Sequence, residues 1–217
     1  MAASVRSKTT LTNSSTVIAP SGITDGDLLL FFAIYNNAKN PTITGFTLQS
    51  EEDVPYLHSG TRRYGLLTKV ASSESGNYTL STSVNAGFML CIRDTDGFDS
   101  FASDVVSTNT TTITFPTLTP ATNNTLILCL AALNNDCTMT AATGYTDDVG
   151  AVFETDGSDS GVAEMSKDAV HVSGATGTVN ATLDKNSHWH ATLTVAIKEV
   201  ATAGGTVTPK LTLLGVG

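Results

Sequence analysis

The sequence predicts an all-β fold, an antiparallel β-sandwich, on three observations. Threonine occupies 36 of the 217 positions and glycine 18; threonine is β-branched and suits strands, whereas glycine suits turns. Apolar runs are short and recur at close intervals with turn residues between them, which is typical of sandwiches and barrels. No segment has a convincing helical period.

Twelve strands are expected along the chain. The clearest signals are apolar runs such as 27–35 and 125–133, and alternating stretches such as 188–198. The full set of expected strands is 9–18, 27–35, 43–49, 62–70, 77–83, 86–93, 111–115, 125–133, 143–147, 162–172, 177–183 and 188–198.

The chain states its strand-and-turn pattern twice. Residues 16–37 (TVIAPSGITDGDLLLFFAIYNN) correspond to residues 112–135 (TITFPTLTPATNNTLILCLAALNN). Residues 86–93 (AGFMLCIR) correspond in the same way to residues 191–198 (ATLTVAIK). The offset grows from 96 to 105 residues, as expected if loops vary while strands do not. We expect an internal pseudo-twofold repeat with halves at about 10–95 and 110–199.

The two halves are expected to form one domain, residues 1–199. The stretch between them, Arg93 to Thr110, contains no proline and no Gly-Ser spacer, although two immunoglobulin-sized units remain the alternative. Residues 200–217 form a separate extension, with Ala203-Gly204-Gly205 followed by an apolar stretch. This extension suits an arm that adds a strand to another subunit, and packing on its own domain is the alternative.

Two kinds of strand are distinguished by their faces. In His188–Lys198 every second residue is apolar, which predicts a strand with one buried and one solvated face. The runs Leu28–Tyr35 and Leu126–Leu133 are apolar on both faces. In a two-layer sandwich their second face needs a loop, a lid or a neighbouring subunit.

The charge and composition of the chain argue against several classes of binding partner. The net charge of −9 disfavours nucleic acid, whose affinity comes largely from lysine and arginine on phosphates, and it disfavours an anionic membrane surface. The longest apolar run has eight residues, against about 20 needed to span a bilayer. The first residues, MAASVRSKTT, lack the apolar segment of a secretory signal. Three cysteines, an odd number without metal-ligand spacing, fit synthesis in a reducing cytoplasm.

Candidate metal ligands have ordinary explanations. His188 and His190 are two residues apart on one expected strand and could chelate a metal with His171 or Asp184. Two histidines on a solvated strand face need no metal, and this is the interpretation that we expect to hold. Two acidic loops carry the remaining candidates, and neither completes a calcium-loop pattern, so solvated turns are expected. These loops contribute Asp94, Asp96 and Asp99, and Glu154, Asp156 and Asp159.

No catalytic constellation is present in the sequence. There is no Gly-x-Ser-x-Gly elbow, and the glycine-containing loop at 157–161 lacks the lysine of a phosphate-binding loop. We therefore expect a protein that is not an enzyme and that has no cofactor and no metal.

The order of motifs resembles a domain found among structural proteins of tailed bacteriophages. The resemblance covers about residues 10–199. It implies a jelly-roll-like β-sandwich in a virion, as a capsid decoration (cement) protein, a head fibre or a tail component, and it implies no catalytic residue. Phe46 stands where that family often has tryptophan. The motifs that carry the resemblance are Ala19–Ile23, Gly26–Leu30, Gly45–Thr47, Tyr64–Ala71, Cys91–Gly97 and His188–Ile197.

The expected function is a non-catalytic structural protein that docks as a dimer or trimer on major capsid or tail proteins at the virion surface. Docking would bury the second apolar face of the two apolar runs, aided by the tail. The expected contact residues are Phe31, Tyr35, Phe98, Phe101, Leu211, Leu213 and Leu214.

The alternative function is a lectin-like module of a tail or head fibre that binds a host-surface glycan. Sugars stack on exposed aromatic rings, and expected loops carry several of them. These rings belong to Tyr35, Tyr56, Phe98, Phe101 and Tyr145.

Overall fold

The computed structural model describes residues 2–36, 41–55, 61–154 and 160–201, and within these ranges the fold is all-β. No helix occurs there, and hence none that is long and apolar enough to cross a membrane. The strands are β1 (Ser4–Val17), β2 (Leu28–Asn36), β3 (Thr47–Pro55), β4 (Thr61–Val70), β5 (Tyr78–Arg93), β6 (Thr95–Val106), β7 (Thr110–Phe115), β8 (Thr125–Leu133), β9 (Met139–Thr140), β10 (Tyr145–Thr146), β11 (Val152–Phe153), β12 (Gly161–Lys167), β13 (Val179–Ser187) and β14 (His190–Glu199).

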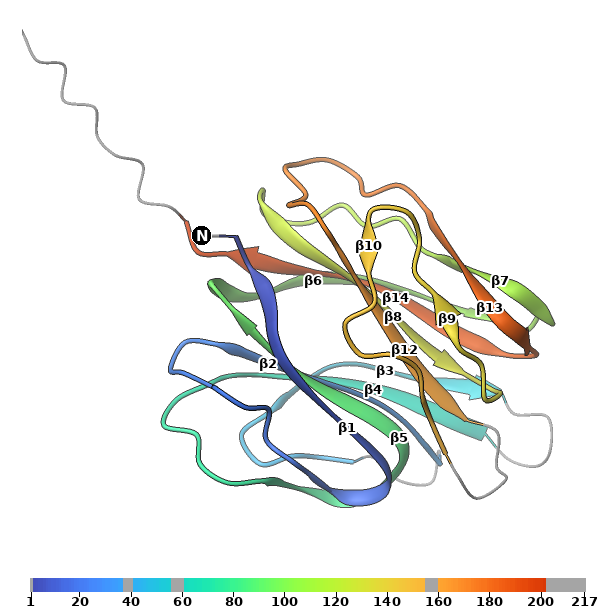
Figure 1. Cartoon of the computed structure of the whole chain (residues 1–217), viewed down its shortest axis with the longest axis horizontal. Coiled ribbons are helices and arrows are strands. Elements are labelled where there is room, and N and C mark those ends of the chain that lie inside the picture. The colour runs from blue at the N-terminus through green and yellow to red at the C-terminus, as the bar shows by residue number, and fades with distance from the viewer. Residues whose placement is uncertain (1, 37–40, 56–60, 155–159, 202–217) are drawn as a thin grey trace, which may run out of the picture.

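Two antiparallel sheets form a sandwich, which confirms the predicted fold class (Figure 1). The N-terminal sheet has the order β1-β5-β2-β4-β3, and the C-terminal sheet has the order β10-β12-β8-β14-β6, with β11 paired to β12. Each sheet is built from one half of the chain, whereas the strands of a jelly roll pass between its two sheets. We therefore describe the fold as an antiparallel sandwich rather than as a jelly roll.

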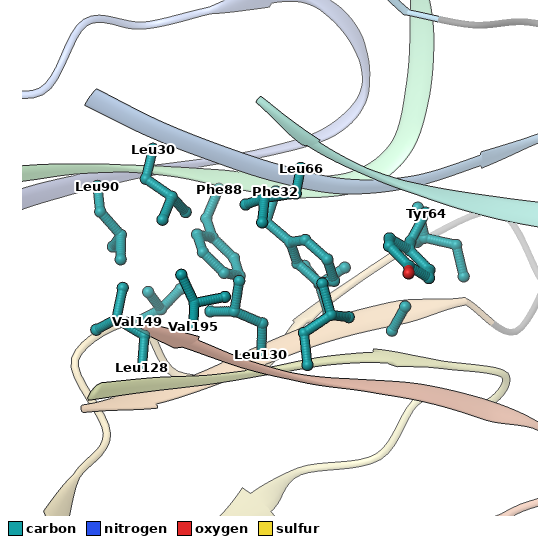
Figure 2. Packing of buried hydrophobic residues seen from close by; sticks show 14 of the residues in the cluster. Leu30, Phe32, Tyr64, Leu66, Phe88, Leu90, Leu128, Leu130, Val149 and Val195 are labelled. Atoms are coloured by element: carbon teal, nitrogen blue, oxygen red, sulfur yellow. The ribbon is translucent and has the colours of Figure 1, made fainter. Parts of the chain in front are cut away.

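The main core lies between these two sheets and draws on both halves of the chain. Leu30, Phe32 and Phe88 project from the N-terminal sheet towards Leu130 and Val195 of the C-terminal sheet (Figure 2). The rings of Phe32 and Phe88 are tilted, with centroids 5.7 Å apart, a favourable aromatic geometry. Such interdigitation of two inner faces is the usual core of a β-sandwich.

The two sheets have corresponding strand registers. In the N-terminal sheet Leu28 of β2 pairs with Ile92 of β5, and in the C-terminal sheet Leu126 of β8 pairs with Ile197 of β14. These four residues are the ones matched in the two sequence repeats. The strand orders also correspond position by position when the C-terminal sheet is read from β6 to β10.

The outer face of β2 is covered by the chain's own loops. Phe31 and Tyr35 on this face are buried with Ile43, and Ile23 and Phe46 pack against the same cluster. Ile23 lies in the connection between β1 and β2, and Ile43 and Phe46 lie in the connection between β2 and β3. The prediction that Leu28–Tyr35 offers a spare apolar face to another subunit is therefore wrong. The sequence left a loop, a lid or a neighbouring subunit as possible covers for this face, and the structure shows loops.

A third sheet, with the order β7-β13-β9, covers the outer face of the C-terminal sheet. We call it the cover sheet. Cys129 and Leu133 of β8 pack against Ile113 and Phe115 of β7 and Leu183 of β13. Leu126–Leu133 is thus enclosed on both sides, and the prediction of a spare face there is wrong as well.

The cover sheet also overturns the prediction of a half-buried strand at 188–198. Thr192 and Thr194 of β14 are buried, and their hydroxyls donate to the carbonyl oxygens of Thr114 (2.9 Å) and Pro116 (2.6 Å). A hydroxyl can satisfy a backbone acceptor in a dry interface, so threonine serves on a face that periodicity alone marks as solvated.

Strand β6 was not predicted. The segment carries Asp96, Gly97, Asp99 and Asp104, residues that are depleted in strands. It is nonetheless a strand because it lies at the sheet edge, where it pairs with β14 and its charged side chains remain accessible. The expected strands 77–83 and 86–93 are one continuous strand, β5.

Candidate interaction surface and polar clusters

The edge of the C-terminal sheet is formed by β6, which carries two of the predicted contact residues. Phe98 and Phe101 lie with ring centroids 6.3 Å apart and are partly buried against the main core. Among the described residues β6 pairs only with β14. From Ser100 to Val106 the pairing runs without a register break. This open edge of regular backbone is a candidate surface for contact with another chain.

Two other predicted contact residues are inside the molecule. Phe31 is 0% exposed and Tyr35 1%. The Tyr35 hydroxyl donates over 3.4 Å to Glu51 Oε2, and burial, followed by the nearby charge of Glu51, raises the pKa of Tyr35. Neither ring is available to a partner. Leu211, Leu213 and Leu214 lie outside the described residues.

The histidines do not meet at one site. His188 is exposed just before β14, whereas His190 is buried, with no hydrogen-bond partner for Nδ1 among the described residues. Burial lowers the pKa of His190, against the opposing charge of Asp104, so the ring is neutral at pH 7. His171 Nε2 contacts the carbonyl oxygen of Gly174 at 2.9 Å. Within the described ranges no three acidic, histidine or cysteine side chains are placed to hold a metal ion.

The first segment expected to be a solvated acidic turn lies mostly in strand β6, so that expectation is wrong for Asp96 and Asp99. Asp99 accepts hydrogen bonds from the Ala121 N–H (2.7 Å), the Thr122 hydroxyl (2.8 Å) and the Ser100 hydroxyl (2.8 Å). Burial alone would raise the pKa of Asp99, but these hydrogen bonds outweigh it and lower the pKa. Asp96 is exposed. The carboxylate of Asp99 therefore ties β6 to the loop before β8.

The second acidic loop contributes one described residue. Glu154 is 4% exposed; it lies 3.6 Å from the Arg62 guanidinium and accepts a hydrogen bond from Asn85 Nδ2 at 3.0 Å. Asp156 and Asp159 lie outside the described residues. The expectation of a solvated turn is therefore wrong for Glu154, which is a buried structural partner of the N-terminal sheet.

The aromatic residues proposed as sugar platforms are spread over the molecule. Tyr145 is partly exposed on β10, and burial raises its pKa to about 12. Trp189, which is not one of these expected platforms, is partly buried against the main core. Tyr56 lies outside the described residues. The described rings do not gather into one exposed platform.

Sequence reasoning missed a buried acid. Glu164 of β12 is fully buried, and neither carboxyl oxygen has a hydrogen bond among the described residues. Its neighbours Asp147 and Asp148 lie on the turn after β10. A glutamate inside the apolar run VAEM was the signal that could have found it.

Comparisons with protein-family models, with curated proteins and with solved structures found no match in any of the three.

Proposed function

We propose that this protein is a non-catalytic structural component of a bacteriophage particle, a capsid decoration protein that docks as an oligomer on the virion surface. The proposal is supported by where the motifs of the phage resemblance lie. Gly45 has a φ of +83°, which glycine adopts without strain. Beside it Phe46 packs edge-on against Tyr78 at 5.4 Å, with the Lys69 ammonium 5.9 Å from its ring centroid. These motif residues build the covering of the N-terminal sheet.

The observation that carries the proposal is that several buried or half-buried charged side chains hold parts of the fold together through hydrogen bonds and ion pairs. Asp99 holds the loop before β8, and Glu154 pairs with Arg62. Asp27 accepts from the backbone N–H of Thr24 at 2.8 Å and lies 3.3 Å from the Arg6 guanidinium. Carboxylates engaged in this way stabilise a rigid scaffold and are poorly placed to act as general acids or bases.

The corresponding registers support an internal pseudo-twofold repeat. A duplication of one half-sandwich would place Leu28 with Ile92 and Leu126 with Ile197 in the same relation. It would also explain why each half supplies one complete sheet. We propose that the chain arose in this way and works as one domain.

The docking surface is assigned to the β6 edge and to the C-terminal extension, since the outer faces of β2 and β8 are covered. Among the described residues the outer side of β6 has no strand partner, and Phe98 and Phe101 lie on this strand. An unpaired strand can accept a further strand from another chain through backbone hydrogen bonds. The extension contains Leu211, Leu213 and Leu214, the apolar side chains that such a strand requires.

Light scattering on the full chain tests this proposal. The unsubstituted protein is expected to be a dimer or trimer. The variant Phe98→Ala and the double variant Leu211→Asp/Leu214→Asp are each expected to be monomeric. Their circular dichroism spectra should match that of the unsubstituted protein, because the fold itself is retained. Val172→Asp is the matched control, because Val172 is an apolar residue with 65% exposure outside the proposed surface.

A glycan array with the same preparations addresses the lectin-like alternative. Absence of glycan binding together with association that depends on these residues supports the structural role. A protein that stays monomeric and binds defined glycans contradicts it.

A further inference from the structure

Glu164 occupies an unusual position for a carboxyl group. It lies on the face of β12 opposite to Ala163 and Met165, which contact the cover sheet, and so it points into the sandwich. Its backbone partner on β8 is Leu130, a main-core residue. The side chain is 0% exposed, and both oxygens lack a hydrogen-bond partner in the described chain. An ionised carboxylate in such a place is strongly disfavoured.

The charged groups around Glu164 add to this cost. The negative charges of Asp147 and Asp148, on the turn after β10, disfavour the ionised form of Glu164. The positive charge of Lys8, an exposed residue of β1, favours it. The Asp148 backbone N–H and Lys8 act in the opposite direction and lower the pKa of Glu164, but burial and the two aspartates outweigh them. Burial first, and then the charges of Asp148 and Asp147, raise the pKa of Glu164 well above 4.5.

The turn that carries these aspartates closes one end of the sandwich. Val149 is buried in the main core near Leu128 (Figure 2). On either side of it, Asp148 accepts a hydrogen bond from the Ser166 hydroxyl, and Asp147 accepts one from the Gly150 N–H at 2.6 Å.

A cavity of about 290 Å³ lies beside this turn. Its lining includes Asp148 and Ser166, Val5 of β1 and Leu126 of β8.

We infer that Glu164 is a proton-linked latch, which in its neutral form allows the turn 147–150 to close the sandwich and on losing its proton repels Asp147 and Asp148 and releases Val149. Neutral Glu164 places no charge next to the two aspartates, so their turn can pack on β12. Ionised Glu164 makes three carboxylates adjacent, with one lysine at the surface to oppose them. This inference holds whether or not the protein belongs to a phage particle.

The sign of the pH effect follows from linkage. Because the pKa of Glu164 is raised in the folded state, its contribution to stability is fully present below the unfolded value near 4.5 and is lost as pH rises through the folded value. Between these two values the folded state holds one more proton than the unfolded state. The folding equilibrium constant therefore falls about tenfold per pH unit from this group alone.

Chemical unfolding of the full chain as a function of pH provides the first test. The variant Glu164→Gln cannot ionise, so its stability relative to the unsubstituted protein should rise about tenfold in folding constant per pH unit and then level off. Asp96→Asn is the control, because Asp96 is an exposed carboxyl on β6 and should leave the profile unchanged. Glu164→Leu fills the same space without polar atoms and should show the same flattened profile if the glutamine variant folds poorly.

Hydrogen exchange provides the second test. Above the transition, amides of residues 145–150 and 161–167 should exchange faster in the unsubstituted protein, while Glu164→Gln keeps them protected and β2 stays protected in both. Parallel stability profiles for the two proteins overturn the inference. So does uniform loss of protection across the chain. Calcium-dependent stabilisation that disappears in Glu164→Gln also overturns it, because it would identify a cation site in place of a proton latch.

Discussion

Arg62 and Glu154 form a buried ion pair that joins the two halves of the chain. Arg62 lies on β4 of the N-terminal sheet, and Glu154 follows β11 of the C-terminal sheet; their side chains are 3.6 Å apart and only 7% and 2% exposed. Asn85 contacts both residues, accepting from Arg62 at 3.2 Å and donating to Glu154 at 3.0 Å. The main core thus ends in a polar cluster at this side of the sandwich.

Removal of one partner of this ion pair should be costly. Arg62→Met leaves Glu154 buried without its main counter-charge, and we expect a loss of about 3–5 kcal/mol in the free energy of unfolding. The double variant Arg62→Met/Glu154→Leu should recover much of that loss. Denaturant unfolding measures both. Arg63→Met is the matched control: its ion-pair partners Asp53 and Glu51 are 49% and 28% exposed, so the expected loss is about 0–1 kcal/mol. Equal losses in Arg62 and Arg63 variants would contradict a buried structural pair.

Gly87 on β5 is required by a close approach to β2. A Cβ at this position would lie 2.9 Å from the Ala33 Cβ and 3.1 Å from the Phe32 carbonyl oxygen. Gly87→Ala should therefore destabilise the protein by about 1–3 kcal/mol, the usual cost of overpacking. Thermal unfolding measures this loss. Ala33→Gly in the same chain should return part of it, and additive effects of the two substitutions would count against this contact as the cause.

The threonine hydroxyls of β14 should hold the cover sheet in place. Thr194→Val keeps the shape of the side chain but removes the donor to Pro116, leaving a carbonyl oxygen without that partner. We expect a loss of about 1–3 kcal/mol and faster hydrogen exchange in β7. Thr182→Val on the exposed side of β13 is the control and should change stability little. Unchanged exchange in β7 would mean that apolar packing alone attaches the cover sheet.

Asp99 should make the protein sensitive to acid. Its pKa is lowered in the folded state by hydrogen bonds that outweigh burial, so its contribution to stability is present above the unfolded value of about 3.8 and is lost as pH falls through the folded value. Asp99→Asn should be less stable at neutral pH and should lose less stability on acidification. An identical dependence on acid in both proteins would show that the Asp99 contacts are not formed in solution.

Sequence patterns predicted the elements that depend on local apolar periodicity. The strand 125–133 has the expected bounds, and Phe88 and Leu193 both lie in the main core as their alternation indicates. The segment β6 was missed because three aspartates obscure its pattern, and an edge strand tolerates such residues. What covers a face is a tertiary property, so the runs that contain Phe31 and Cys129 could not reveal whether a loop, a third sheet or a second subunit encloses them.

The candidate site was predicted less well than the fold. Phe98 and Phe101 lie together at an open edge, whereas Phe31 and Tyr35 fill the interior. Aromatic residues favour both cores and interfaces, and composition alone does not separate these roles. Glu164 was missed although its place in the apolar run VAEM indicates burial. Sequence could not show that Asp147 and Asp148 act on it, because they reach it through the turn after β10.

The molar mass of the full-length protein in solution, measured by sedimentation equilibrium over a wide range of concentration, tests the proposed role as an assembling structural protein most directly. The account predicts a mass two or three times the 22.5 kDa of one chain, falling towards one chain when Phe98 is replaced by alanine. A mass of one chain at every concentration would contradict it.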